Sequence, residues 1–302
     1  MLTQMACASC IIDDLRGALE ATVTDEAERL AILCEALSWM GQEFDQQRIP
    51  SFYITRVHRL LKERTKQEMP FRDLRKRCNE AGLALRDQVA REVMGIGNDL
   101  ERLRLLVLWA IAGNYLDFRT VGTGYHLPVE DIAAQLSLVV SEGLAVDHVA
   151  ALQALLRKHC RVLYLADNVG EIALDTLLVA ELQRYGCHIT VAIKGGPITS
   201  DAVWEDAHEV GMDKLAPLIL TGPDTLGLPL DEMSADLRAE LEQTNVVISK
   251  GQANYYACSE LVHRYQGSFL CLLRTKCLVT AQSLGLDRAR TNVAVLLASG
   301  ND

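Results

Sequence analysis

The stretch RVLYLADNVGEIALD, residues 161–175, decides the fold class. After Arg161 the residues are apolar as far as Ala166, and the run stops abruptly at Asp167 and Asn168, before a segment of helical periodicity. A short apolar run bounded in this way is typical of a strand that is buried on both faces of a parallel sheet. The polar pair then stands at the carboxyl end of that strand, either as a cap of the next helix or as part of a binding site.

The same pattern recurs along the second half of the chain. Amphipathic segments that begin near Gly170, Asp201, Ser234, Ala253 and Thr275 alternate with the apolar runs RVLYLA, HITVAI, LAPLILT, NVVIS and SFLCLL. This alternation predicts an α/β fold with a doubly wound, mostly parallel, Rossmann-like sheet covered by helices and joined by right-handed crossovers.

The first half has a different period. From Asp13 to about Lys158 apolar residues recur at helical spacing, which predicts about seven or eight helices and no sheet. We therefore expect two domains, an N-terminal all-helical domain at residues 1–158 and an α/β domain at residues 159–302.

Composition excludes several classes of protein. An apolar fraction of 49% and a charged fraction of 23% are those of a globular protein, and the net charge of −10 argues against a nucleic-acid partner. No long apolar segment or signal-peptide pattern is present, so we expect a cytoplasmic protein with no membrane partner. Nine cysteines, an odd number, indicate free thiols rather than a disulfide framework.

Groups that bind ions or phosphate follow three of the apolar runs. They are Asp167, Asn168, Lys194, Gly195, Asp201, Lys250 and Asn254. The carboxyl ends of parallel strands meet at one edge of a sheet, which is where such folds bind ligands. Two carboxylates and an amide oxygen suit Mg²⁺ or Mn²⁺, lysines suit phosphate, and the absence of a paired histidine at these ends disfavours zinc. Taken singly, the aspartates are also ordinary helix caps and the lysines ordinary solvated side chains.

Five segments of the chain resemble the damage-control phosphatase family, known as domain of unknown function 89 (DUF89). They are LADNVGEIALD (165–175), VAIKGGPITSDAVWEDAHEVG (191–211), VISKGQANYYA (247–257), AIAGNYLDF (110–118) and CASC (7–10). The matches stand in family order along nearly the whole chain. The chain departs from the family at Tyr256, where related members often carry glutamate, and this position bears on substrate preference.

The resemblance implies a metal-dependent phosphomonoester hydrolase that acts on small phosphorylated metabolites, either sugar phosphates or damaged phosphometabolites. The implied cofactor is one divalent ion: Mn²⁺, Mg²⁺, Co²⁺ or Ni²⁺. The implied metal ligands are Asp167, Asn168 and Asp201, with Asp167, Asp201 and Lys250 in catalysis and Lys250 on the phosphate. The further substrate-binding candidates are Asn254, Lys194, Gly195, Glu171, Asn114 and Asp117. The sequence leaves open the physiological substrate, the metal, the oligomeric state, and whether a metal-bound water or an aspartate attacks.

Two other functions are compatible with a fold of this kind. An adenosine-cofactor-dependent transferase of the methyltransferase kind suits a doubly wound sheet, but DNVGE (167–171) has one glycine where such proteins carry Gly-x-Gly-x-x-Gly. A non-catalytic phosphometabolite-binding protein would keep the pocket without the reaction.

Two smaller features of the sequence also stay open. Cys7 and Cys10 have metal or redox spacing, with Cys277 as a distant partner, but without a second Cys-x-x-Cys we expect them to be packed thiols outside the active site. Asn114 and Asp117 are three apart, so on a helix they share a face, where either substrate or an interface network would satisfy them.

Overall fold

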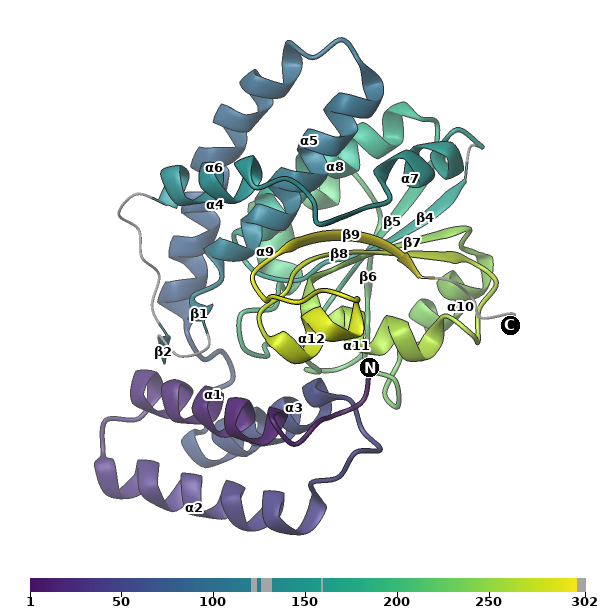
Figure 1. Ribbon diagram of the computed structural model, residues 1–302. Helices are drawn as coiled ribbons and strands as arrows, with labels where there is room; N and C mark the ends of the chain where they lie inside the picture. Colours follow the sequence, from purple (N-terminus) through teal and green to yellow (C-terminus); the bar gives the residue numbers. More distant parts are fainter. Residues whose placement is uncertain (121–123, 126–131, 159, 298–302) are drawn as a thin grey trace.

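A seven-stranded sheet forms the centre of the computed structural model, which describes residues 1–120, 124–125, 132–158 and 160–297 (Figure 1). The strands are β3 (Val146–Asp147), β4 (Arg161–Leu165), β5 (His188–Ile193), β6 (Leu218–Leu220), β7 (Val246–Lys250), β8 (Ser268–Arg274) and β9 (Asn292–Leu297). Their order is β3-β9-β8-β7-β4-β5-β6, and all neighbours are parallel except β8 and β9. A separate two-stranded antiparallel pair joins β1 (Arg119–Thr120) to β2 (Gly124–Tyr125).

The central strand β4 explains why the sheet is parallel and buried. Its residues from Val162 to Leu165 are all fully buried, because helices cover both faces. Successive side chains point to opposite faces, so Tyr164 belongs to one apolar cluster and Leu163 and Leu165 to another. A sheet apolar on both faces must be covered on both, which is the layered fold that the apolar runs predicted.

Helices of the first half make up much of that covering. The α-helices of the described residues are α1 (Cys7–Thr22), α2 (Glu26–Glu43), α3 (Pro50–Thr65), α4 (Arg72–Met94), α5 (Asp99–Ala112), α6 (Ile132–Ser141), α7 (Val149–Leu156), α8 (Glu171–Arg184), α9 (Trp204–Glu209), α10 (Ala235–Gln243), α11 (Gly251–Leu261) and α12 (Leu278–Ser283). Short 3₁₀ turns, η1 (Gly113–Leu116) and η2 (Met212–Lys214), follow α5 and α9. Helices α1 to α3 pack on one another at the lower end of Figure 1. Helices α5 and α8 contact each other, and α5 also lies on β8 and β9. Helix α11 packs on β7 and β8, and α10 packs on β4 and β6.

The mixed α/β fold with a mostly parallel sheet is confirmed, and the five expected strands are present. Two strands of this sheet, β3 and β9, and the separate β1–β2 pair were missed. The prediction that the first half contributes no strand is wrong, since Val146–Asp147 pairs with β9 as the edge of the sheet. Two residues are too few to show an alternating pattern, and β9 runs against its neighbour, so neither fits the strand-helix-strand repeat. The domain boundary at residue 158 stays a prediction. A single cluster of contacting buried apolar side chains includes residues of both halves, from Ile11 to Ala294.

In the described residues, no helix is at once long enough and apolar enough to cross a bilayer.

Candidate active site

The loops that follow β4 and β5 meet at the carboxyl edge of the sheet. Asp167 and Asn168 follow β4 directly, and Asp201 stands in the loop after the neighbouring β5. Backbone pairing joins the two loops, since Asn168 forms an antiparallel bridge with Asp201 and the N–H of Ala202 donates to the carbonyl of Asp167 over 2.7 Å. The three side chains predicted to bind a metal are therefore brought together by two adjacent parallel strands.

The start of α11 packs directly onto the Asp167 carboxylate. Its first residue, Gly251, has a φ of +77°, and a Cβ atom there would lie 1.7 Å from Oδ2 of Asp167. Only glycine tolerates both the left-handed backbone and the close approach. This glycine thus lets the start of α11 lie against the Asp167 carboxylate.

Asp167 is a buried carboxylate surrounded by other acids. Its Oδ2 accepts hydrogen bonds from Nδ2 of Asn168 over 2.9 Å and from Nδ2 of Asn114 over 3.3 Å. Burial first, and then the nearby charges of Glu171 and Asp201, raise the pKa of Asp167 well above its ordinary value. The ionised form is therefore unstable here unless a cation lies close to it.

Asp201 is also buried, but it has a cationic neighbour. Burial raises its pKa, and the nearby Lys194, whose Nζ lies 3.5 Å from Oδ2 of Asp201, opposes part of that rise. The N–H of Gly227 donates to the same oxygen over 3.3 Å. Asp201 is thus held by the loop between β6 and α10 as well as by its own.

Two amides connect Asp167 to Glu171. Nδ2 of Asn168 donates to Oε2 of Glu171 over 3.0 Å, and Nδ2 of Asn114 donates to the same oxygen over 3.2 Å. Oδ1 of Asn168 accepts from the hydroxyl of Ser200 over 2.8 Å, which leaves one lone pair of that oxygen for a further ligand. Asn114 lies in η1, so a residue from the first half of the chain contacts both Asp167 and Glu171.

Lys250 lies beneath the site and is 0% exposed. Its Nζ donates to the carbonyl of Ala110 over 2.9 Å, to Glu171 over 2.5 Å and to Asp175 over 2.6 Å. Burial lowers the pKa of Lys250, but the two carboxylates more than offset this and leave it raised. An ammonium has three donors and all are used, so this arrangement does not favour the predicted contact with phosphate.

Three other predicted residues hold the loops and lie outside the cavity walls. Nζ of Lys194 donates to the carbonyl of Gly227 over 2.6 Å and to Oδ1 of Asn254 over 3.3 Å. Nδ2 of Asn254 donates to the carbonyl of Ala166 over 3.1 Å. Gly195 lies where a Cβ atom would come within 2.0 Å of the carbonyl of Gly222. In this structure their role is to position the backbone around Asp167 and Asp201.

A cavity of about 230 Å³ opens beside the aspartates. Its lining combines the predicted metal ligands with two cations and with apolar and thiol side chains. The lining residues are Ala6, Cys7, Cys10, Ile11, Pro50, Ile54, Arg119, Asp167, Asn168, Asp201, Leu226, Gln252, Ala253, Tyr256, Lys276, Cys277, Leu278 and Val279. This cavity can therefore bind a molecule that carries both an anionic group and an uncharged group.

The two cations of the cavity were missed by the sequence reasoning. Nζ of Lys276 donates to Oδ2 of Asp117 over 2.8 Å, and Oδ1 of Asp117 accepts from the N–H of Arg119 over 2.8 Å. Burial lowers the pKa of Lys276, but Asp117 and, more weakly, Asp167 raise it overall, so it carries its charge. Lys276 follows β8, and inspecting the end of the fifth apolar run would have found it. Arg119 also forms an ion pair with Asp14, and no sequence pattern marks it.

The expectation that the cysteines lie outside the site is wrong. Cys7 and Cys10 begin α1, and this end of the helix packs against the segment after β8, so both thiols line the cavity together with Cys277. Burial raises the pKa of Cys7 and Cys10, which favours the uncharged thiol. Tyr256, where related chains often carry glutamate, lies in the same wall, and burial raises its pKa as well.

The donor set fits a divalent cation only if the amide or additional oxygens take part. Among the residues that the structure describes, no three histidine, cysteine, aspartate or glutamate side chains are arranged to hold a metal. Asp167 and Asp201 supply two carboxylates, and Asn168 supplies an amide oxygen with a free lone pair. The raised pKa of Asp167 is consistent with a cation site, because a bound cation would stabilise the ionised form of this carboxylate.

Comparison with known proteins places this geometry in a family. A model described as the damage-control phosphatase ARMT1-like domain matches residues 3–291. An uncharacterized protein, MJ0202, of Methanocaldococcus jannaschii is 32% identical over 93% of this chain and 91% of its own. A damage-control phosphatase of Archaeoglobus fulgidus is 30% identical over 93% of this chain and 94% of its own. The crystal structure of a DUF89 family protein, PH1575, from Pyrococcus horikoshii superposes with a TM-score of 0.86 at 25% identity, covering 98% of this chain and 99% of that one.

Proposed function

The chain belongs to the damage-control phosphatase ARMT1-like family, and from this premise we propose that it is a metal-dependent phosphatase acting on small phosphorylated metabolites. The observation that carries the proposal is the meeting of Asp167, Asn168 and Asp201 with Lys276 and Arg119 in one cavity. Carboxylates with an amide suit a hard divalent cation, and cations beside them suit a phosphate.

Each part of the cavity has a role in this reaction. Asp167, Asn168 and Asp201 would hold the cation, which would supply neutralisation of the charge on the phosphoryl oxygens. Lys276 and Arg119 would bind the phosphate and keep it against the aspartates. Asp201 is the carboxylate that we expect to act as nucleophile or base, since fewer amides hold it than hold Asp167.

The residues beneath the cavity would position the reacting groups. Glu171 and Asn114 fix the orientation of Asp167 through the amide network, and Lys250 balances the charges of Glu171 and Asp175. A fixed carboxylate needs little rearrangement when the phosphate arrives, which is how preorganised sites lower a barrier.

The size and lining of the cavity limit the substrate. A volume of about 230 Å³ admits a phosphate with a small organic group, and Ile11, Ile54 and Leu226 present apolar walls to that group. We therefore propose small phosphomonoesters, including sugar phosphates and damaged phosphometabolites, as the substrate class.

Phosphate release from a panel of sugar phosphates, measured with EDTA and then with Mn²⁺, Mg²⁺, Co²⁺ or Ni²⁺, tests the proposal. We expect release only with metal, and a loss of about 100-fold or more in kcat for Asp201→Asn. Lys276→Met should raise KM for the phosphate ester. Lys214→Met, which removes an exposed lysine elsewhere, is the matched control. Full turnover in EDTA, or in a folded Asp201→Asn variant, would show that the proposal is wrong.

A further inference from the structure

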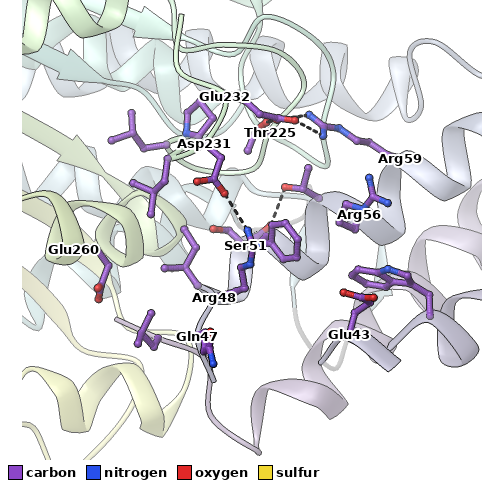
Figure 2. Close-up of a pocket in the computed structure, with 18 of the residues that line it drawn as sticks. Glu43, Gln47, Arg48, Ser51, Arg56, Arg59, Thr225, Asp231, Glu232 and Glu260 are labelled. Carbon is purple, nitrogen blue, oxygen red and sulfur yellow. Dashed lines mark hydrogen bonds and ion pairs between the residues drawn. The ribbon is translucent and has the colours of Figure 1, made fainter. Parts of the chain in front are cut away.

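A second cavity, of about 750 Å³, lies beside α3 and is lined by side chains that include Ser51, Arg56 and Arg59 (Figure 2). Helix α3 separates it from the candidate active cavity, because Pro50 and Ile54 line the candidate active cavity while Ser51 and Thr55 line the second. The remaining walls of the second cavity come from α2, the loop between β6 and α10, and the end of α11. Its volume falls within the range of about 300–1,000 Å³ that is usual for small-molecule sites.

Some of the charges in this second cavity are already neutralised. Arg48 forms an ion pair with Asp231 over 3.0 Å, and Arg59 forms one with Glu232 over 2.8 Å (Figure 2). Arg59 also donates to Asp224 over 2.9 Å, so its position is fixed from two sides. These pairs build the wall and leave little charge for a ligand.

Two further arginines, Arg56 and Arg264, line the second cavity without an ion pair to any described residue. One acidic side chain of the lining, Glu43, is likewise without an ion pair in the described part of the chain. The lining holds four arginines and four acids, and its remaining acid, Glu260, pairs with the N-terminal ammonium, so the side chains without an ion pair are two arginines and one glutamate. An excess of guanidinium groups in a concave site favours an anion.

The N-terminus of α3 adds a second set of donors. This helix of 16 residues begins with Pro50 after Ile49, has no side-chain cap and no acid in its first turn. Ser51, in that first turn, is buried, lines the cavity, and its Oγ has no hydrogen-bond partner. A buried hydroxyl without a partner is uncommon, and beside an uncapped helix N-terminus it is a donor available to an oxyanion.

Aromatic and aliphatic side chains form the rest of the lining. The guanidinium of Arg48 lies 4.5 Å from the ring centre of Phe52, and that of Arg56 lies 5.7 Å from the ring centre of Trp39. Leu228 lies in the same cavity. These side chains offer apolar area next to the cations, so the occupant needs an apolar body as well as a negative charge.

We propose that this second cavity binds an organic phosphate of mononucleotide size, with its phosphate on Arg56, Arg264 and the start of α3 and its base against Trp39 and Phe52. Inorganic phosphate alone would leave most of the volume and the apolar wall unused. An uncharged apolar molecule would leave both arginines and the Ser51 hydroxyl without partners. The acids of the wall can accept hydrogen bonds from ribose hydroxyls and from the amino group of a base.

Calorimetric titration of the full chain with AMP, GMP, CMP and UMP tests this site. The titrations are done in EDTA, so that no metal-dependent hydrolysis consumes the ligand. We expect saturable binding of at least one nucleotide at one site per chain, with quenching of tryptophan fluorescence that is lost in Trp39→Phe. Inorganic phosphate should bind about tenfold more weakly or not at all, because it lacks the apolar contacts. If none of the four nucleotides binds, or inorganic phosphate binds as tightly, the proposal is wrong.

Variants separate this site from the candidate active site. The double variant Arg56→Gln/Arg264→Gln should weaken binding about tenfold or more, and Ser51→Ala about threefold, since charged hydrogen bonds contribute more than neutral ones. Arg91→Gln, an equally exposed arginine on α4, is the matched control and should bind as the unchanged chain does. Binding that survives in the double variant but is lost in Lys276→Met would place the nucleotide in the candidate active site and overturn the proposal.

Discussion

Replacing Lys250 with methionine distinguishes a phosphate contact from a structural charge. Methionine keeps the apolar stem and removes only the Nζ atom that lies 2.5 Å from Glu171 and 2.6 Å from Asp175. All three side chains are at most 1% exposed, so the variant leaves two carboxylates buried without their counter-charge. Breaking a buried ion pair by removing one partner costs about 3–5 kcal/mol, and we expect a loss of that size in the free energy of unfolding.

Urea unfolding, followed by circular dichroism at neutral pH, measures this loss. Lys276→Met is the informative comparison, because that side chain is 30% exposed and its one carboxylate partner, Asp117, also accepts from the N–H of Arg119, so the loss should be smaller than for Lys250→Met. Adding Glu171→Gln and Asp175→Asn to Lys250→Met should restore much of the stability, since no unpaired charge then stays buried.

The opposite pattern would refute this reasoning. If Lys250→Met unfolds at the urea concentration of the unchanged chain and has only a raised KM for phosphate esters, Lys250 contacts the substrate as the resemblance implies. The structural role that its three hydrogen bonds indicate would then be wrong.

Three further predictions concern the same region. Gly251→Ala should lower the free energy of unfolding by about 1–3 kcal/mol. The loss should be smaller for Gly285→Ala, because Gly285 has a similar φ of +73° but a Cβ there would meet nothing within 4 Å. Equal losses in the two variants would contradict the close approach of Gly251 to Asp167. Asp175 has a pKa raised by burial from 3.8 to about 6, so the folded state binds its proton more tightly and this stabilisation is lost as pH rises from about 4 to 6. Asp175→Asn should remove that slope from urea midpoints measured across this range, and an unchanged slope would assign it to another group. In EDTA at pH 8, Asp167→Asn should raise the melting temperature, because it removes a charge that burial and Glu171 destabilise. Mn²⁺ should raise the melting temperature of the unchanged chain only. A lower melting temperature of the variant in EDTA would show that the ionised form of Asp167 is well accommodated.

The pattern of apolar runs predicted most of the sheet, and the exceptions have simple causes. RVLYLA, HITVAI, NVVIS and SFLCLL form buried strands, because a strand covered on both faces must be apolar. LAPLILT forms the edge strand β6, which is only partly buried. Val146–Asp147 was missed because two residues carry no period, and Asn292–Leu297 because the antiparallel strand follows no crossover helix.

The sequence by itself determined which residues stand at the carboxyl edge, since Asp167, Asn168 and Asp201 follow adjacent strands wherever the chain adopts this fold. The direction of each side chain was decided only by the tertiary structure. Lys250 ends β7 and Lys276 follows β8, but Lys250 contacts Glu171 and Asp175 while Lys276 reaches the cavity. A lysine adopts whichever direction offers a counter-charge, and those partners come from segments distant in sequence, such as Asp117 in the first half. Position along the strand is a local property, whereas the electrostatic environment of a side chain exists only once the chain has folded.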